Sequence, residues 1–148
     1  MSESVHSHVG ASSAYRWMVC SGSVRLCKNQ PKTSSRYAFE GVAAHQLAEL
    51  CLRRGDDASA FLGKSMTIEG HEFDVGEEMA EGVQVYLDVV RADLQPGDVM
   101  AIEERFDLNH FYPGMFGTND CSIYRPSSGL LIVYDLKYGA GVAVQAAA

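Results

Sequence analysis

Paired cysteines, long apolar runs and an excess of basic charge are all missing from this sequence. The 4 cysteines are scattered along the chain, with no C-x-x-C pair among them. Structural zinc sites need ligands paired at short spacing, so we do not expect a zinc ribbon or finger. Four cysteines in 148 residues are also too few for a disulfide scaffold. We therefore expect free thiols that are mostly buried.

No apolar run approaches the ~18 residues that a membrane span requires. The first ten residues, MSESVHSHVG, are polar and lack the basic-then-apolar layout of a secretion signal. We therefore expect a cytoplasmic protein with no membrane partner.

The net charge is −7, which is a mild argument against a polyanionic partner, because nucleic-acid binding draws on Lys and Arg. It does not exclude an enzyme whose bound cations offset carboxylates locally. The basic residues lean towards the N-terminal third, so a phosphate-binding surface would lie in that first segment. Those before position 40 are Arg16, Arg25, Lys28, Lys32 and Arg36.

The chain has about the length of one domain, and we find no repeat or linker that would divide residues 1–148. Amphipathic spacing and capping residues predict helices near 14–20, 37–53 and 76–95. Alternating patterns predict a small hairpin within 65–75, a strand near 98–108 and a hairpin over 121–134. Helices followed by an antiparallel three-strand meander make an α+β fold.

The second hairpin lies in the stretch GTNDCSIYRPSSGLLIVYDLKYG, residues 117–139. If Pro126–Gly129 is a four-residue loop, Arg125 pairs with Leu130, and Asp120 then falls opposite Asp135. Like charges directly opposed across a hairpin are destabilising, and a divalent cation between them would compensate. Oxygen ligands suit magnesium or manganese. The alternative is that these charges are solvated and that Lys137 simply pairs with an aspartate.

An acid at the start of one strand, followed by D-x-K on the next, resembles the signature of the PD-(D/E)XK nuclease superfamily. GTND and LLIVYDLKYG resemble its RecB-like branch, and EGVAAHQLAEL resembles that branch's helical motif. The stretch SSAYRWMVCSGSVRL is similar to a segment of phage and prophage exonuclease-like proteins. The resemblance runs from about Ser12 to Val144 and implies a restriction-endonuclease-like core, a mixed sheet flanked by helices.

The resemblance also implies roles for single residues. His45 would be a metal ligand from the helix, Asp120 the central acid and Asp135 the second acid, with the Leu136 carbonyl as a further ligand. Lys137 would orient the attacking water or stabilise charge on the phosphate. The implied cofactor is Mg²⁺ or Mn²⁺, and the implied partner is DNA, as linear or single-stranded ends, in phage recombination or replication. Because some relatives carry an iron–sulfur cluster, one bound by the cysteines also stays open.

Three glutamates are weaker candidates. Glu49 shares a helix side with His45, where a surface His-Glu pair at i,i+4 is the alternative to a metal site. Glu40 either complements the helix N-terminus or reaches towards the site. Strict strand alternation turns Glu104 inward, whereas the resemblance aligns Glu103 with a family glutamate.

The sequence departs from the family pattern in two places. The first acid follows Asn119 rather than a proline, and the Q-x-x-x-Y motif expected after the D-x-K strand is absent before Ala148. We therefore carry two main hypotheses. The first is a metal-dependent DNA nuclease, whose single domain lacks its last helix. The second is a catalytically inactive nuclease-fold module that binds nucleic acid or a protein. An unrelated α+β domain with a chance D-x-K is a third.

Overall fold

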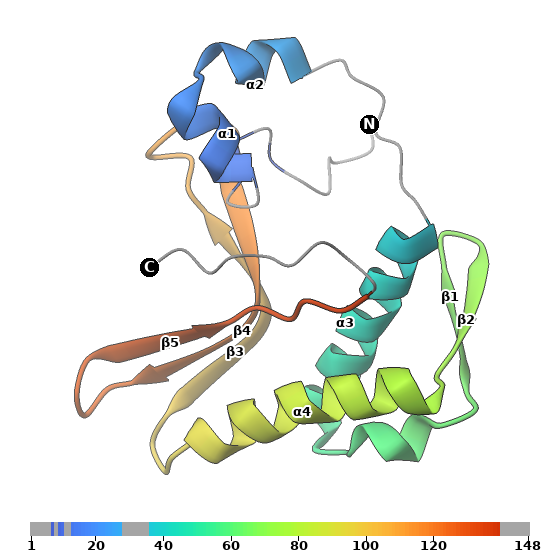
Figure 1. Ribbon diagram of the computed structural model, residues 1–148. Helices are drawn as coiled ribbons and strands as arrows, with labels where there is room; N and C mark the ends of the chain where they lie inside the picture. The colour runs from blue at the N-terminus through green and yellow to red at the C-terminus, as the bar shows by residue number, and fades with distance from the viewer. Residues whose placement is uncertain (1–6, 8, 11–12, 28–35, 140–148) are drawn as a thin grey trace. The chain divides into compact units, whose positions relative to one another are not determined.

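The computed structural model describes residues 7, 9–10, 13–27 and 36–139, and the fold is α+β (Figure 1). Within those residues, no helix is long and apolar enough to cross a membrane. The elements, in chain order, are α1 (Ala14–Val19), α2 (Gly22–Cys27), α3 (Arg36–Arg54), the 3₁₀ helix η2 (Ala58–Phe61), β1 (Ser65–Ile68), β2 (His71–Asp74), α4 (Glu77–Asp93), β3 (Val99–Asp107), β4 (Phe116–Arg125) and β5 (Leu130–Tyr134).

The chain divides into two compact units. Unit 1 comprises Met1–Thr33 and Glu103–Asn119, and unit 2 comprises Ser34–Ile102 and Asp120–Ala148. The strands β3 and β4 each run through both units, with the boundary at the 102–103 and 119–120 peptide bonds.

Unit 2 contains the hydrophobic core. α3 packs on α4, on η2 and on the β1–β2 hairpin, as Figure 1 shows in teal, yellow-green and green. Apolar residues three and four positions apart give each helix a buried face. The largest fully buried side chains on the two helices are Leu47 and Cys51 of α3 and Val83, Leu87 and Val90 of α4. The two helices were predicted from this spacing and the hairpins from alternating patterns, and the structure confirms both.

The β1–β2 hairpin turns at Glu69 and Gly70, whose φ angles are 47° and 83°. Ile68 pairs with His71, so the loop has two residues. Positive φ at both loop residues is the geometry of the tight turns that match the twist of hairpin strands. The Gly after Glu69 therefore fixes the register that buries Ile68 and Phe73 against the core.

The three-stranded sheet has the order β3-β4-β5, and the register of its hairpin follows the prediction. β4 and β5 are antiparallel, with Arg125 opposite Leu130 and Cys121 opposite Tyr134. The hairpin is fastened to the end of α4 by Arg125, whose guanidinium donates to both carboxylate oxygens of Asp98 and to the Asp93 carbonyl. The hairpin is therefore held at its turn end, which orients the opposite end, where Asp120 lies.

Unit 1 consists of α1, α2 and the residues 103–119. A helix near 14–20 was predicted, but α2 was not, because Ser21-Gly22-Ser23 has the composition of a turn. Instead the Ser23 N–H donates to the Cys20 carbonyl, and a second helix begins at Gly22. The expectation of mostly buried cysteines holds for Cys51 and Cys121 in unit 2, whereas Cys20 in unit 1 is exposed; all four are free.

Candidate metal centre

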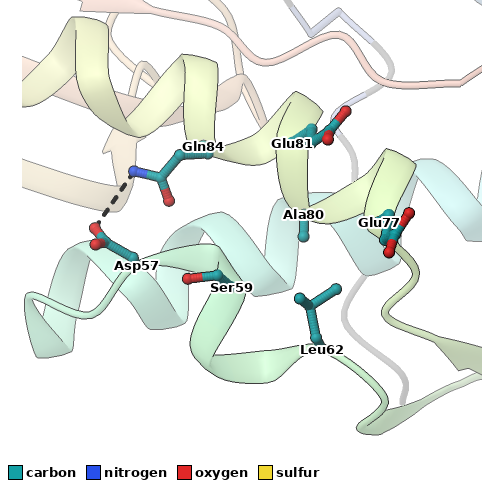
Figure 2. A pocket seen from close by; sticks show the side chains of 7 residues that line it. All are labelled: Asp57, Ser59, Leu62, Glu77, Ala80, Glu81 and Gln84. Atoms are coloured by element: carbon teal, nitrogen blue, oxygen red, sulfur yellow. Dashed lines mark hydrogen bonds between the residues drawn. The ribbon is translucent and has the colours of Figure 1, made fainter.

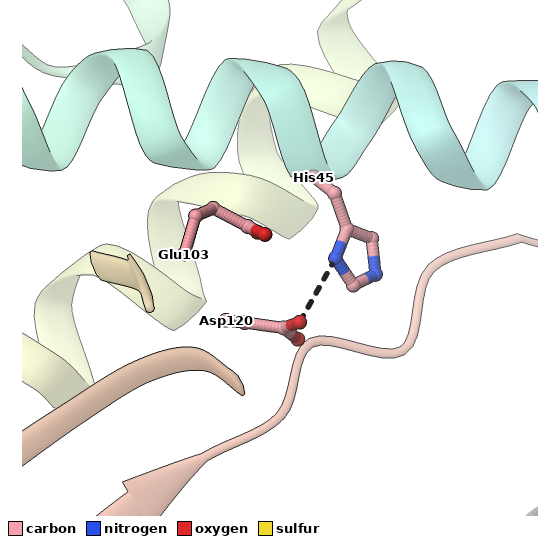
Figure 3. Close-up of side chains that lie close together, drawn as sticks. All are labelled: His45, Glu103 and Asp120. Atoms are coloured by element: carbon pink, nitrogen blue, oxygen red, sulfur yellow. Dashed lines mark ion pairs between the residues drawn. The ribbon is translucent and has the colours of Figure 1, made fainter. Parts of the chain in front are cut away.

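Asp120 is the first residue of β4 that belongs to unit 2, and its carboxylate is held from two sides. One oxygen accepts the Leu136 N–H at 2.6 Å, and the other lies 3.4 Å from His45 Nδ1 (Figure 3). Burial raises the pKa of Asp120, but the hydrogen bonds from His45 and Leu136 and the charges of His45 and Lys137 outweigh it. The pKa is therefore below its ordinary value, and the carboxylate is ionised at neutral pH.

His45 reaches Asp120 from the middle of α3. The main buried stripe of this helix includes Leu47 and Cys51, and His45 lies to one side of it, next to the second buried side that carries Ala48 and Leu52. Because neighbouring helix residues are separated by about 100°, His45 lies on the same side of α3 as Leu52 and away from Leu47 and Cys51. The side chain is only 29% exposed.

Asp135 and Lys137 follow directly after β5. The register would place Asp135 opposite Asp120, but the paired ladder stops one pair earlier, at Cys121 and Tyr134. The Asp135 carboxylate instead forms an ion pair with Lys137 Nζ at 2.5 Å, and both side chains are more than half exposed. This is the arrangement that the alternative reading of the D-x-K motif described. Lys137 is nevertheless close enough to Asp120 to lower its pKa.

Glu103 has the least ordinary backbone in β3. Its φ is 50°, a value that side chains other than Gly rarely adopt and that costs on the order of 1–2 kcal/mol. A residue in this conformation breaks the strict alternation of a strand. The expectation that Glu104 turns inward assumed unbroken alternation. Glu103 is joined by its peptide bond to Ile102, the last residue of this stretch of unit 2.

Within unit 2, His45 and Asp120 each offer a potential ligand atom, and these two atoms lie 3.4 Å apart (Figure 3). Glu103 belongs to unit 1. Asp135, predicted as the second acid, pairs with Lys137 instead. The Leu136 carbonyl was predicted as a ligand. In the structure, the Leu136 N–H donates a hydrogen bond to Asp120.

The two other glutamates have different surroundings. Glu49 forms an ion pair with Arg53 at 2.8 Å, and Arg53 also donates to the Ile102 carbonyl, so Glu49 helps fasten β3 to α3. Glu40 lies beyond the first turn of α3 and contributes, with Glu78, to raising the pKa of Tyr138 after burial itself.

Tyr138 and two glycines were missed by sequence reasoning. A Cβ on Gly82 of α4 would lie 3.1 Å from the Tyr138 ring, and one on Gly41 of α3 would lie 3.5 Å from the Tyr138 carbonyl oxygen. The segment after β5 therefore passes close to both helices, with Leu136 in the core. A glycine in the interior of an otherwise amphipathic helix is the signal that could have indicated such a close approach.

A surface pocket of unit 2 between η2 and α4 lies apart from these residues (Figure 2). Gln84 donates to Asp57 at its edge, and Arg91 forms an ion pair with the same carboxylate. None of the residues predicted for the site lines it. The lining residues are Asp57, Ser59, Leu62, Glu77, Ala80, Glu81 and Gln84.

Comparison with known proteins places the sequence in a family. No solved structure matches the chain. The family described as "Protein of unknown function (DUF2800)" matches residues 6–148, which is nearly the whole sequence. The chain therefore belongs to the DUF2800 family.

Proposed function

We propose that this protein is a metal-dependent nuclease that hydrolyses phosphodiester bonds in DNA. The observation that carries the proposal is the position of the Asp120 carboxylate, which accepts the Leu136 N–H and lies 3.4 Å from the His45 imidazole, with Lys137 next to Leu136 in the chain. An acid on one strand, an ammonium after the next strand and an imidazole from a helix are the groups that the resemblance to PD-(D/E)XK nucleases implies. The preference for linear ends rests on that resemblance.

The donor set supports a divalent cation. Ligand atoms bound to one Mg²⁺ ion at about 2.1 Å lie about 3–4 Å apart. The 3.4 Å between His45 Nδ1 and the Asp120 oxygen falls in this range. An imidazole beside a carboxylate suits Mn²⁺ well, and Mg²⁺ through the carboxylate oxygen. A bound divalent cation would supply a water of lowered pKa and offset charge on the phosphate.

The remaining work belongs to side chains of the chain itself. The Leu136 N–H fixes one oxygen of Asp120, so the other oxygen and His45 keep their positions. Lys137 is more than half exposed and carries an ammonium that a phosphate oxygen could reach in place of Asp135. A fixed positive charge at the reacting phosphate stabilises the extra negative charge of the transition state.

The test is degradation of linear DNA with Mg²⁺ or Mn²⁺ by the full chain and by Lys137→Ala and Asp120→Asn. We expect each substitution to lower the rate at least about a hundredfold, as removal of a transition-state charge does. Arg54→Ala, an exposed arginine at the end of α3, serves as the matched control and should retain the wild-type rate. Robust cleavage by the Lys137→Ala variant would refute this assignment of the site.

A binding module without catalysis is the second candidate, and the pairing of the Asp135 carboxylate with Lys137 rather than with a metal site favours it. Titration calorimetry with Mn²⁺ separates the two. The nuclease requires a heat of binding that Asp120→Asn abolishes. The module predicts no such heat, together with DNA affinity that a chelator does not change.

A further inference from the structure

The helices α1 and α2 of unit 1 expose large side chains with little cover. No side chain of α1 is buried, and in α2 only Ser23 is. Tyr15 is 78% exposed and Val19 is 88% exposed, values unusual for an aromatic and a branched apolar residue in a folded helix. We name the exposed set the α1–α2 surface; it consists of Tyr15, Arg16, Met18, Val19, Arg25 and Leu26.

The orientation of α1 is fixed by its single tryptophan. The Trp17 indole N–H donates to the Gly10 carbonyl at 3.1 Å, and the Ser13 hydroxyl donates to the same oxygen. At about 100° per residue, Tyr15 and Val19 lie on the side of the helix opposite Trp17. The tryptophan therefore anchors α1 within unit 1, and the tyrosine ring is presented to solvent.

The sequence segment that contains α1 and α2 has a charge of opposite sign to that of the whole chain. Residues 4–39 contain five Lys or Arg residues and no Asp or Glu, whereas the chain has a net charge of −7. Two of the five, Arg16 and Arg25, are exposed on α1 and α2. Basic side chains interleaved with an exposed aromatic ring provide phosphate neutralisation and base stacking together, the two contributions on which single-strand binders rely.

We infer that the α1–α2 surface binds a single strand of DNA, with Arg16 and Arg25 on phosphates and Tyr15 stacked on a base. Duplex DNA keeps its bases stacked on one another, so an exposed ring has a partner only on an unpaired strand. This inference rests on the proposed function for the identity of the polymer, but it concerns binding rather than cleavage. It places substrate capture in unit 1 and the chemical step on Asp120 and Lys137 of unit 2.

Fluorescence anisotropy of a labelled oligothymidylate of about 20 nucleotides, with the full chain in chelator, tests the inference without cleavage. We expect Tyr15→Ala to weaken binding about fivefold or more, and Tyr15→Phe, which keeps the ring, to retain the affinity. The variant with both Arg16→Ala and Arg25→Ala should bind more weakly. Its slope of log affinity against log salt should also fall by about 1.4, because two phosphate contacts are lost.

The controls separate this inference from the proposed function. Arg54→Ala, in unit 2, should bind as the wild type does. Circular dichroism should show all variants folded, because α1 buries no side chain and Arg25 and Arg54 are exposed. Equal affinity of the double arginine variant and the wild type would refute the inference even if the protein cleaves DNA. Loss of binding in that variant supports it even if no cleavage is found. Equal affinity for duplex and single strand, or binding only to anionic vesicles, would also refute it.

Discussion

The two units differ most in what they bury. In unit 2, buried apolar side chains from α3, α4, the β1–β2 hairpin and the β4–β5 hairpin form one hydrophobic cluster. In the described part of unit 1, the only buried residues are Val9, Gly10 and Ser23. Since burial of apolar surface is the dominant favourable term in folding, the two units should differ greatly in stability.

The difference in burial indicates which unit suits the chemical step and which suits an adaptable binding surface. A reacting group needs a fixed geometry, and Asp120, His45 and Lys137 all belong to the unit with the packed core. An adaptable binding surface needs exposed side chains rather than a core, and unit 1 provides them on α1 and α2. Low local stability is common in elements that bind and order around a ligand.

The largest expected effect compares a core residue of unit 2 with an exposed residue of unit 1. Leu47 is fully buried in α3, so Leu47→Ala should lower the free energy of unfolding by about 2–5 kcal/mol. Met18 of α1 is exposed, and Met18→Ala should change it by less than about 0.5 kcal/mol. Urea unfolding followed by far-UV circular dichroism, to which the long helices α3 and α4 contribute most, measures both.

The sole tryptophan sharpens this comparison, because Trp17 reports on unit 1 alone. We expect its fluorescence to change at lower urea than the circular dichroism signal, and Leu47→Ala to bring the two transitions closer. Coincident transitions in the wild type, or a Met18→Ala effect as large as that of Leu47→Ala, would show that the two units unfold as one.

The sequence predicted the elements of unit 2 because their signals are local. α3 and α4 have the helical spacing of apolar residues, and Glu69-Gly70 and Pro126–Gly129 are turn sequences, so both hairpins could be placed, and the second with its register. Unit 1 has weaker signals. α2 is six residues long and begins directly after α1, and a segment of that length has too few turns for an amphipathic pattern.

For the hairpin part of the site, the sequence predicted the register of the strands but not where their pairing ends. Opposition of Asp120 and Asp135 followed from the hairpin count, but where the paired ladder ends depends on the packing of Leu136 and Tyr138 after β5. The positive φ of Glu103 could not be foreseen either, because strand reasoning assumes regular alternation. Regular strand geometry predicts neither feature.

An effect of intermediate size concerns the segment that carries Lys137. Replacing Gly82 by Ala should stabilise an isolated helix by about 1 kcal/mol, but here the new methyl group would meet the Tyr138 ring at 3.1 Å. We expect Gly82→Ala to be neutral or destabilising in the wild type, and to stabilise the Tyr138→Ala variant by about 1 kcal/mol. A double-mutant cycle in urea measures the coupling. Identical effects in both backgrounds would mean that Tyr138 does not lie against α4.

The smallest expected effect compares two carboxylates with lowered pKa, one in each unit. The pKa of Asp98 in unit 2 is lowered by hydrogen bonds from Arg125, which is distant in sequence. The pKa of Asp107 in unit 1 is lowered by the N–H and side chain of Asn109, two residues away. The Asp98 interaction requires the folded sheet, whereas the Asp107 interaction is local and can persist in the unfolded chain.

A carboxyl whose folded pKa is below its unfolded value of about 3.9 stabilises the protein above that pH, and the contribution is lost as the pH falls through the folded value. We therefore expect Asp98→Asn to lower the melting temperature at neutral pH and to flatten its fall below about pH 4. Asp107→Asn should leave both close to the wild type, because the folded and unfolded pKa of Asp107 differ less. Thermal melts across this range measure the slopes. Equal flattening by both substitutions would mean that the Asp107 turn forms only together with the folded unit 1, which would give that unit more tertiary stability than its sparse burial indicates.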